Sequence, residues 1–334
     1  MIVRIKTEVQ RMKEKTGLSL VWLLKHLDIG RTTYYNWLNW KPREKKGFVH
    51  ILKPLQWEEE SVIGYAKDHY GIGYKKLAYQ MLDKGIVSLT PPQVYRILKS
   101  RNLLDKLGRV NSFAGKEYKD KPMKPNEHWH TDIMYIKILE MWCFLIVILD
   151  GYSRYVIGWK VMLDMTAQSV SLFMQEVIDN NPCLSVLHKI GDSVKLINDN
   201  GSQLISRDFK EVLLSANIQQ IRIRRNHPQS NGKVERFNGL VRQECLRPHS
   251  PVTLNEVKKV IREYVDYYNN HRLHSAIDYM KPVDYYKGNV FEIQRQREEK
   301  LKLARERRVE ENRTFNQGLK TQTTSYFKSA NCSV

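Results

Sequence analysis

Three acidic residues, widely separated along the chain, have neighbours that make them candidates for chemistry. Asp132 lies inside an apolar, β-type run from Trp129 to Ile136, and Asp199 follows the short run from Val194 to Asn198. A carboxylate buried in such a run without a partner is heavily penalised, so something must neutralise it. The third acid, Glu235, lies among amides and cations. Three converging carboxylates would repel one another, and divalent cations with oxygen ligands are the usual remedy.

Glu235 is expected on a helix that begins after a loop. Loop and helix-start signals are present at His227-Pro228 and at Ser230-Asn231-Gly232. An apolar stripe on this helix is predicted to face inward, and it consists of Val234, Phe237 and Val241. The opposite face is wholly polar and consists of Asn231, Glu235, Asn238 and Arg242. One carboxylate among amides and cations is unusual for a solvated face and is reasonable for a metal ligand beside a phosphate.

The order of the three acids, with thirty-five residues between Asp199 and Glu235, resembles the DDE catalytic triad of retroviral integrases and related insertion-sequence transposases. The flanking motifs agree: His130-Thr131-Asp132, Leu149-Asp150-Gly151-Tyr152-Ser153-Arg154, Asn198-Asp199-Asn200-Gly201 and His227-Pro228-Gln229-Ser230-Asn231-Gly232. The chain most closely resembles the integrase-like transposases of the copy-out–paste-in insertion sequences, over roughly Asn126 to Tyr286.

The resemblance implies a transposase that binds the ends of a mobile element, cleaves a phosphodiester to free a 3′-hydroxyl, and joins that hydroxyl to DNA. It implies two Mg²⁺ or Mn²⁺ ions, roughly 3.5–4 Å apart. Asp132 would bridge both ions, Asp199 would hold one, and Glu235 the other. No covalent enzyme intermediate is required. Lys233 and Arg236, which flank Glu235, are hypothesised to hold the DNA backbone.

Other residues near the triad have different expected roles. Asp150 ends an apolar strand, but with Gly151 it fits a structural turn. His128, His130 and His227 are expected to pack or to form hydrogen bonds. Two alternatives stay open: a ribonuclease-H-type nuclease would share the acids but does not need sequence-reading modules, and a DNA-binding regulator without catalysis would not need all three acids.

The elements around the acids predict the fold class. Three strands are expected over Trp129–Ile138, Trp142–Leu149 and Arg154–Met162, followed by a helix after Thr166, a strand over 194–198, a helix over about 203–215 and a strand near Ile221–Ile223. The resemblance assigns this order to a ribonuclease-H-like α/β core. The fold class is therefore multidomain, with N-terminal all-α helix-turn-helix modules, this core, and a helical C-terminal extension.

Residues 1–45 are predicted to form a DNA-binding helix-turn-helix. Ser19 can cap a helix with Leu20, Leu23, Leu24 and Leu27 on one side, Gly30 provides a tight turn, and Thr32 can cap a second short helix. In such motifs the N-terminal residues of the second helix reach base edges. The candidates for DNA contact are Arg31, Thr32, Thr33, Tyr34 and Asn36. An ordinary αα-hairpin is the alternative.

A second helical, DNA-binding module is expected over 55–104, where Thr90 caps a helix that begins at Pro91. Its segment Tyr70-Gly71-Ile72-Gly73-Tyr74 resembles a stretch found before the core in the same transposases; a packing spacer is the alternative. A linker over 105–125 leads to the core over 126–245, and a helical extension over 246–290 contains the capping box Thr253-Leu254-Asn255-Glu256. Residues 291–334 are expected to form a charged helix, solvated or in contact with DNA, with a disordered tail over the last twenty residues.

Charge is distributed unevenly over these regions. The chain has a formal net charge of +19, yet residues 126–240 hold equal numbers of basic and acidic residues. The positive charge therefore belongs to the flanks, which indicates that they bind a polyanion while the core does chemistry. The expected partner is double-stranded DNA, both element ends and target, held by at least a dimer because one triad cannot easily hold two ends and a target.

The four cysteines lack paired spacing, which favours a reducing cytosol. The sequence shows neither a signal-peptide pattern nor a long apolar run, so we expect a nucleoid-associated protein without a membrane anchor. No cysteine precedes Cys143, so the N-terminal His/Cys zinc module of retroviral integrases is not expected.

Overall fold

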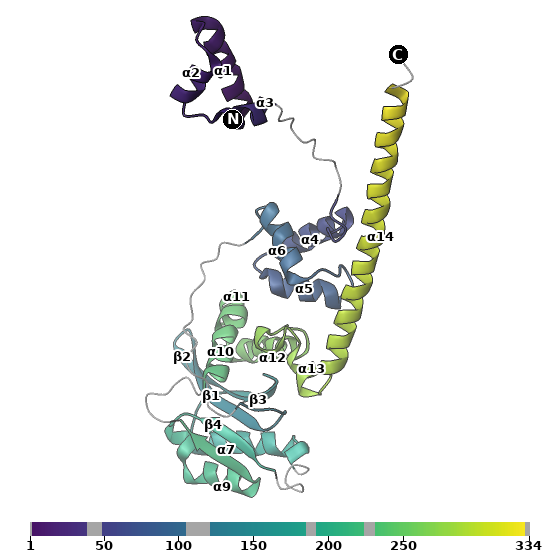
Figure 1. The fold of residues 1–334 in the computed structure, drawn as a ribbon. Coiled ribbons are helices and arrows are strands. Elements are labelled where there is room, and N and C mark those ends of the chain that lie inside the picture. Colours follow the sequence, from purple (N-terminus) through teal and green to yellow (C-terminus); the bar gives the residue numbers. More distant parts are fainter. Residues whose placement is uncertain (1, 39–48, 105–120, 185–191, 224–230, 331–334) are drawn as a thin grey trace. The chain divides into compact units, whose positions relative to one another are not determined.

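The computed structural model describes residues 2–38, 49–104, 121–184, 192–223 and 231–330 (Figure 1). The chain divides into two compact units. One unit comprises Met1–Lys53 and Val309–Val334, and the other comprises Pro54–Arg308. No helix in the described ranges is long and apolar enough to cross a membrane.

The N-terminal unit begins with three short helices: α1 (Ile2–Thr16), α2 (Leu20–His26) and α3 (Arg31–Leu38). As predicted, Ser19 caps α2, and its side chain accepts a hydrogen bond from the Trp22 amide at 3.3 Å. The small core between the helices is formed by Val9, Leu24 and Tyr34, one from each helix. Burial of these three apolar side chains is what fixes α2 and α3 against α1.

Two details of the predicted turn need correction. The left-handed residue between α2 and α3 is Asp28, with φ 54°, and Gly30 does not adopt positive φ. Asp tolerates this conformation better than most residues, so the turn does not need glycine there. Thr32 does not cap α3, because the helix already begins at Arg31 and the Tyr34 amide donates to the Gly30 carbonyl at 3.0 Å.

The same unit contains the later part of α14 (Val290–Ala330). Two asparagines of α14 bind the backbone of residues 49–53: Asn312 donates to the Ile51 and Lys53 carbonyls, and Asn316 exchanges two hydrogen bonds with Val49. The predicted disordered tail is wrong as far as Ala330, since α14 continues to that residue. The stretch contains no proline to end the helix.

In the second unit, three helices pack around one apolar core: α4 (Gln56–Asp68), α5 (Tyr74–Asp83) and α6 (Pro91–Ser100). Gln93 accepts a hydrogen bond from the Thr90 amide at 3.0 Å, so α6 begins at the predicted proline with its predicted cap. Tyr70 lies beyond the end of α4 and is 84% exposed.

Some charged residues of α14 form ion pairs within the protein, so this helix is not wholly solvated. Arg297 forms two hydrogen bonds with Asp83, both at 2.8 Å. Arg308 binds both carboxylate oxygens of Glu58 at 2.8–3.0 Å and also donates to the Ser88 carbonyl. The side chains of Arg308 and Glu58 are only 4% and 2% exposed. The earlier part of α14 therefore holds the α4–α6 module through buried ion pairs.

The core contains a five-stranded sheet in the order β3-β2-β1-β4-β5. Its strands are β1 (His128–Ile138), β2 (Met141–Asp150), β3 (Val156–Met162), β4 (Val194–Asn198) and β5 (Ile218–Arg222). The first three strands pair antiparallel, and β4 and β5 add in parallel to β1. Each lies within two residues of the predicted strand, except that β5 begins three residues earlier than Ile221.

Helices cover both faces of the sheet (Figure 1). On one face lie α7 (Ala167–Asp179), the 3₁₀ turn η1 (Ser202–Ile205) and α9 (Arg207–Ser215). Thr166 caps α7 as predicted, accepting from the Ser169 amide. Gly158 of β3 allows the close approach of α7, since a Cβ there would lie 2.5 Å from a Val177 methyl carbon.

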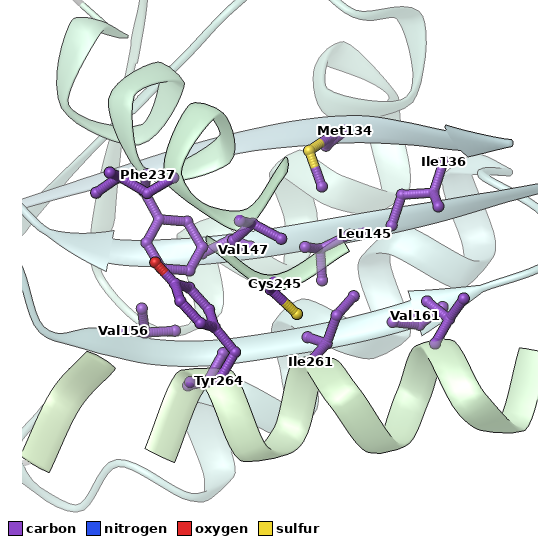
Figure 2. Packing of buried hydrophobic residues seen from close by; sticks show 14 of the residues in the cluster. Met134, Ile136, Leu145, Val147, Val156, Val161, Phe237, Cys245, Ile261 and Tyr264 are labelled. Atoms are coloured by element: carbon purple, nitrogen blue, oxygen red, sulfur yellow. The ribbon is translucent and has the colours of Figure 1, made fainter. Parts of the chain in front are cut away.

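The other face is covered by α10 (Gly232–Leu240), the π-helix η3 (Val241–Leu246) that continues it, and α12 (Leu254–Asn270). Figure 2 shows Phe237 of α10 with Ile261 and Tyr264 of α12 against the strands. The predicted inward stripe of Val234, Phe237 and Val241 is buried here.

Short elements connect and close this face: α11 (Arg247–His249), η4 (Ser275–Ile277) and α13 (Pro282–Tyr286). The Thr253 hydroxyl accepts a hydrogen bond from the Glu256 amide, as a capping box requires. The Glu256 carboxylate, however, accepts from the Val252 amide and not from the Thr253 amide.

Candidate active site

Asp132 is placed by the alternation of side chains along β1. Met134, Ile136 and Ile138 of this strand point into the apolar cluster beneath α10 and α12. Side chains two residues apart share one face of a strand, so Asp132 faces the same helices. Its side chain is only partly buried, since the apolar cluster on this face of β1 begins at Met134.

Asp199 reaches the same level through the parallel pairing of β4 with β1. His128 pairs with Lys195 and His130 with Ile197, an offset of 67 residues. The same offset relates Asp132 to Asp199. Asp199 follows directly after β4 and is exposed, and its Oδ1 accepts from the Gly201 amide at 3.0 Å. The sheet register therefore brings the two aspartates side by side at the end of the neighbouring strand.

Glu235 comes from α10, in the first turn of the helix, and is exposed. One turn later on the same helix, Asn238 donates from Nδ2 to Asp132 Oδ2 at 2.9 Å. Residues three apart on a helix are neighbours on its surface, so this hydrogen bond places Glu235 beside Asp132. Asn238 is buried, although the sequence placed it on an outward polar face with Glu235.

The electrostatics show how closely the acids are coupled. Burial raises the pKa of Asp132 to about 6, and the negative charges of Asp199 and Glu235 add to the rise. Hydrogen bonds from the Ile133 amide and then from the Asn238 side chain oppose this rise. Burial also raises the pKa of Glu235. Asp132 is thus within electrostatic range of both other acids, and a cation beside it would favour its ionised form.

The donor chemistry of this site fits a hard divalent cation. Asp132, Asp199 and Glu235 offer carboxylate oxygens, the ligands that Mg²⁺ and Mn²⁺ prefer. Among the residues that the structure describes, none forms a hydrogen bond with the buried Oδ1 of Asn238. In the described ranges no three acidic, histidine or cysteine side chains lie close enough together to hold a metal ion as they stand.

A second buried amide supports the strand that carries Asp132. Asn231 donates from Nδ2 to the Thr131 carbonyl at 3.0 Å, and its Oδ1 lies 3.3 Å from His130 Nδ1. Burial, followed by the charge of Lys233, lowers the pKa of His130 to about 3. The imidazole is therefore neutral, with its proton on Nδ1 facing the amide oxygen. His130 packs and forms a hydrogen bond, as the sequence predicted, and ties α10 to β1.

Asp150 has structural partners instead of catalytic ones. It is fully buried, and it accepts hydrogen bonds from the Asn126 amide at 2.8 Å and from the Ser153 amide and hydroxyl at 2.7 and 2.6 Å. Burial raises its pKa against these hydrogen bonds. The turn also needs Gly151, because a Cβ there would lie 2.9 Å from His130 Nε2 and 3.0 Å from the His128 carbonyl oxygen.

The hydrogen bonds of Asn231 and Asn238 to β1 were not predicted from the sequence. Their position on one face of the helix with Glu235 was visible, but the direction of that face depends on how α10 packs. The predicted motif residues 227–230, including His227, lie outside the described residues.

The predicted DNA contacts divide into exposed and buried residues. Arg31, Thr32, Thr33 and Asn36 are exposed on α3, and Arg236 is exposed on α10; Lys233 is half-buried. Tyr34 needs correction, because its side chain is only 2% exposed and packs in the core of the three N-terminal helices. Its neighbour Tyr35 is 50% exposed.

Comparison with known proteins agrees with this geometry. Residues 122–228 and 216–282 each match a family model described as an integrase core domain. The chain is 22% identical over 271 residues to a 31 kDa protein of insertion element IS600 from Shigella sonnei, covering 76% of this chain and 93% of that protein.

Two further relatives are transposases. The chain is 30% identical over 172 residues to the transposase for insertion sequence element IS904 from Lactococcus lactis, covering 51% of this chain and 64% of that protein. It is 21% identical over 287 residues to the transposase for IS629 from Shigella sonnei, covering 83% and 93%. Among solved structures, the integrase catalytic core domain of HTLV-2 in complex with magnesium aligns with a TM-score of 0.36 at 19% identity, covering 49% of this chain and 98% of that one.

The predicted fold class is confirmed: the core has a ribonuclease-H-like mixed sheet, preceded by helical modules and followed by a helical extension.

Proposed function

Because this chain belongs to the DDE-type insertion-sequence transposases and is a polynucleotidyl transferase of the transposase/integrase class, we propose that it cuts DNA at the ends of a mobile element and joins the freed 3′-hydroxyl to target DNA. The observation that carries this proposal is the position of Asp132 on β1: the pairing of β1 with β4 brings Asp199 beside it, and the hydrogen bond from Asn238 of α10 brings Glu235 beside it. We further propose that the pathway is of the copy-out–paste-in type.

Two divalent ions, Mg²⁺ or Mn²⁺, are proposed to be held by Asp132, Asp199 and Glu235. When bound, they would activate the attacking oxygen and stabilise the leaving oxygen of a phosphodiester. Asp132 would help to hold both ions, since β-strand pairing places it beside Asp199 and the contact with Asn238 places it beside Glu235.

The chain's own residues orient this site. Asn238 holds one oxygen of Asp132 through a hydrogen bond from α10. Neutral His130 and Asn231 keep α10 in register with β1, so Glu235 stays at a fixed height above the sheet. Lys233 and Arg236 are proposed to bind phosphates beside the scissile bond, where cations stabilise the developing negative charge.

The N-terminal unit is proposed to recognise the element ends. The exposed start of α3, with Arg31, Thr32, Thr33 and Asn36, is the base-reading surface, and Tyr35 replaces Tyr34 as its aromatic member. The sequence-independent part of the affinity comes from the basic flanks, so binding is expected to weaken steeply as salt rises.

The test is a strand-transfer assay. The substrate is a labelled duplex carrying the inverted repeat that borders the gene, with Mg²⁺ or Mn²⁺ and a supercoiled target. Asp132→Asn, Asp199→Asn and Glu235→Gln each remove one ligating charge at nearly constant shape, so each is expected to abolish cleavage and joining while end binding persists.

Joining by Asp199→Asn protein at near wild-type rates would refute this assignment. Cleavage without joining in the wild-type protein would indicate a nuclease, and end binding without either reaction would indicate a regulator.

We propose that at least two subunits act together on DNA, with one subunit's N-terminal unit holding the end cut by another's triad. Mixing Glu235→Gln protein with a variant lacking residues 1–50 tests this arrangement. Recovered joining in the mixture is expected, whereas an inactive mixture at every ratio would contradict action in trans.

A further inference from the structure

A cavity of about 730 Å³ lies in the unit formed by Pro54–Arg308 and has no part in the chemistry described above. The segment Tyr70–Gly73, between α4 and α5, lines one side with Lys76. Residues of η3, α12 and the following loop line the other side, among them Glu244, Tyr267 and Arg272. A volume of this size is within the range of small-ligand sites, roughly 300–1,000 Å³.

Glu244, which lines the cavity, already has hydrogen-bond partners within the protein. Arg272 donates from Nε and Nη2 to the two oxygens of Glu244, at 2.8 and 2.7 Å. The Tyr264 hydroxyl donates to the same carboxylate at 3.0 Å. Glu244 thus has a bidentate cationic partner and a hydroxyl donor, and its charge is largely compensated.

Lys76 is a cation without such a partner. No hydrogen bond or ion pair to its Nζ is present among the described residues, and it is half-buried. Burial, followed by the charge of Arg272, lowers the pKa of Lys76, and Glu244 offsets this only in part. The exposed Glu263 at the rim is the remaining acid. A partly desolvated ammonium group beside a guanidinium is stabilised by an anion that enters from solution.

The cavity also offers aromatic rings against which a flat apolar group can pack. Tyr70 is 84% exposed and Tyr267 is 41% exposed, although both line the cavity. Gly71 adopts φ +83° and has open space where a Cβ would lie, so the backbone beside Tyr70 presents no side chain there. Aromatic rings beside a cation are the usual platform for the bases of a single nucleic-acid strand.

We propose that this cavity binds one nucleotide of an unpaired DNA strand, with its phosphate at Lys76 and its base against Tyr70 and Tyr267. A duplex keeps its bases stacked inside, so a cavity that offers aromatic rings to a base favours a single strand. Glu244 lies on the helix that continues from Glu235, roughly 13 Å further along its axis. The site is thus a few nucleotides from the triad, and in this respect only the proposal rests on the proposed function.

The test measures binding without catalysis, on the full chain in EDTA. The probe is a fluorescein-labelled ten-nucleotide oligothymidylate, followed by anisotropy at several salt concentrations. Lys76→Ala is expected to weaken binding about fivefold or more and to flatten the log–log salt slope by about 0.7, the value for one phosphate of a single strand. Lys75→Ala is the matched control: the same helix, the same charge removed, but exposed and outside the cavity. It is expected to stay within about twofold of wild type.

Crosslinking locates the base. A 5-iodouridine oligonucleotide is expected to crosslink to the peptide containing Tyr70 or Tyr267, with competition by unlabelled single strands and not by a blunt duplex. Lys76→Arg keeps the charge and is expected to restore binding, which separates a lost contact from a misfolded protein.

Equal effects of the two lysine substitutions would overturn the proposal, as would crosslinks only elsewhere or equal competition by duplex. Glu235→Gln protein is expected to bind and crosslink normally; if it still joins DNA, the catalytic assignment fails while the cavity assignment stands.

Discussion

Replacing Asp132 by asparagine is expected to stabilise the metal-free protein while destroying its response to metal. The carboxylate is ionised at neutral pH against an unfavourable environment, since its pKa rises from 3.8 to about 6 on folding. Each pKa unit corresponds to about 1.4 kcal/mol, so the shift sets an upper limit of about 3 kcal/mol. Because the side chain is partly exposed, we expect about 2 kcal/mol. The introduced amide can still accept the hydrogen bond from Asn238 through its carbonyl oxygen.

The pH dependence follows from the sign of the shift. Below about pH 4 the carboxyl group is protonated in both the folded and the unfolded protein, so it adds no penalty to folding. As pH rises through 4 to 6, the unfolded chain releases its proton first and the folded protein loses stability relative to it. The advantage of Asp132→Asn over wild type is therefore expected at pH 7.5 and should fade as pH falls from about 6 toward 4.

Thermal unfolding in EDTA measures the effect. A gain of about 2 kcal/mol corresponds to roughly 4–8 °C in Tm for a unit of this size. Adding Mg²⁺ or Mn²⁺ at about ten times its Kd would stabilise wild type by about 1.4 kcal/mol and leave the variant unchanged. Asp179→Asn, an exposed acid at the end of α7, serves as control. A variant that is no more stable than wild type in EDTA, and that still gains stability from the metal, would refute the coupled carboxylate site.

Three further substitutions test the structural assignments. Asp150→Asn is expected to lower Tm, since an amide cannot accept all the hydrogen bonds that the buried carboxylate accepts, while residual folded protein keeps its joining activity. Arg308→Met is expected to destabilise the protein by about 3–5 kcal/mol in urea unfolding, because it removes the cationic partner of the buried Glu58 carboxylate and leaves it only the hydrogen bond from the Leu55 amide. Tyr34→Ala should unfold the N-terminal unit, seen by limited proteolysis, whereas Tyr35→Ala should keep it folded and weaken end binding in a gel-shift assay.

Each of these has a contrary outcome. Full stability with selective loss of joining in the Asp150 variant would make that residue catalytic. An Arg308 variant as stable as wild type would mean that α14 does not hold the α4–α6 module. Intact folding after loss of the Tyr34 side chain would return this residue to the DNA-binding surface.

The sequence alone was enough to propose the three acids of the candidate site and to predict the elements that carry them. The acids stand in runs whose periodicity is local, so the strands over 128–138 and 194–198 and the helix with Glu235 could be predicted within a few residues. The caps of α2, α6, α7 and α12 could also be predicted, because a cap depends on side chains and amides three residues apart. The apolar stripe of α10 followed from the same local spacing.

Only the tertiary structure decided which polar groups meet. The contact of Asn238 with Asp132 joins residues 106 positions apart, and that of Arg308 with Glu58 joins residues 250 apart. Tyr34 is buried because α1, which lies outside the two-helix motif, covers it. Periodicity identifies a polar face, yet its surroundings are set by the packing partner. From the sequence alone, the charged run of α14 is expected to be solvated. Two of its arginines are nevertheless buried in ion pairs. The energy of each pair depends on an acidic residue that comes near only when the chain folds.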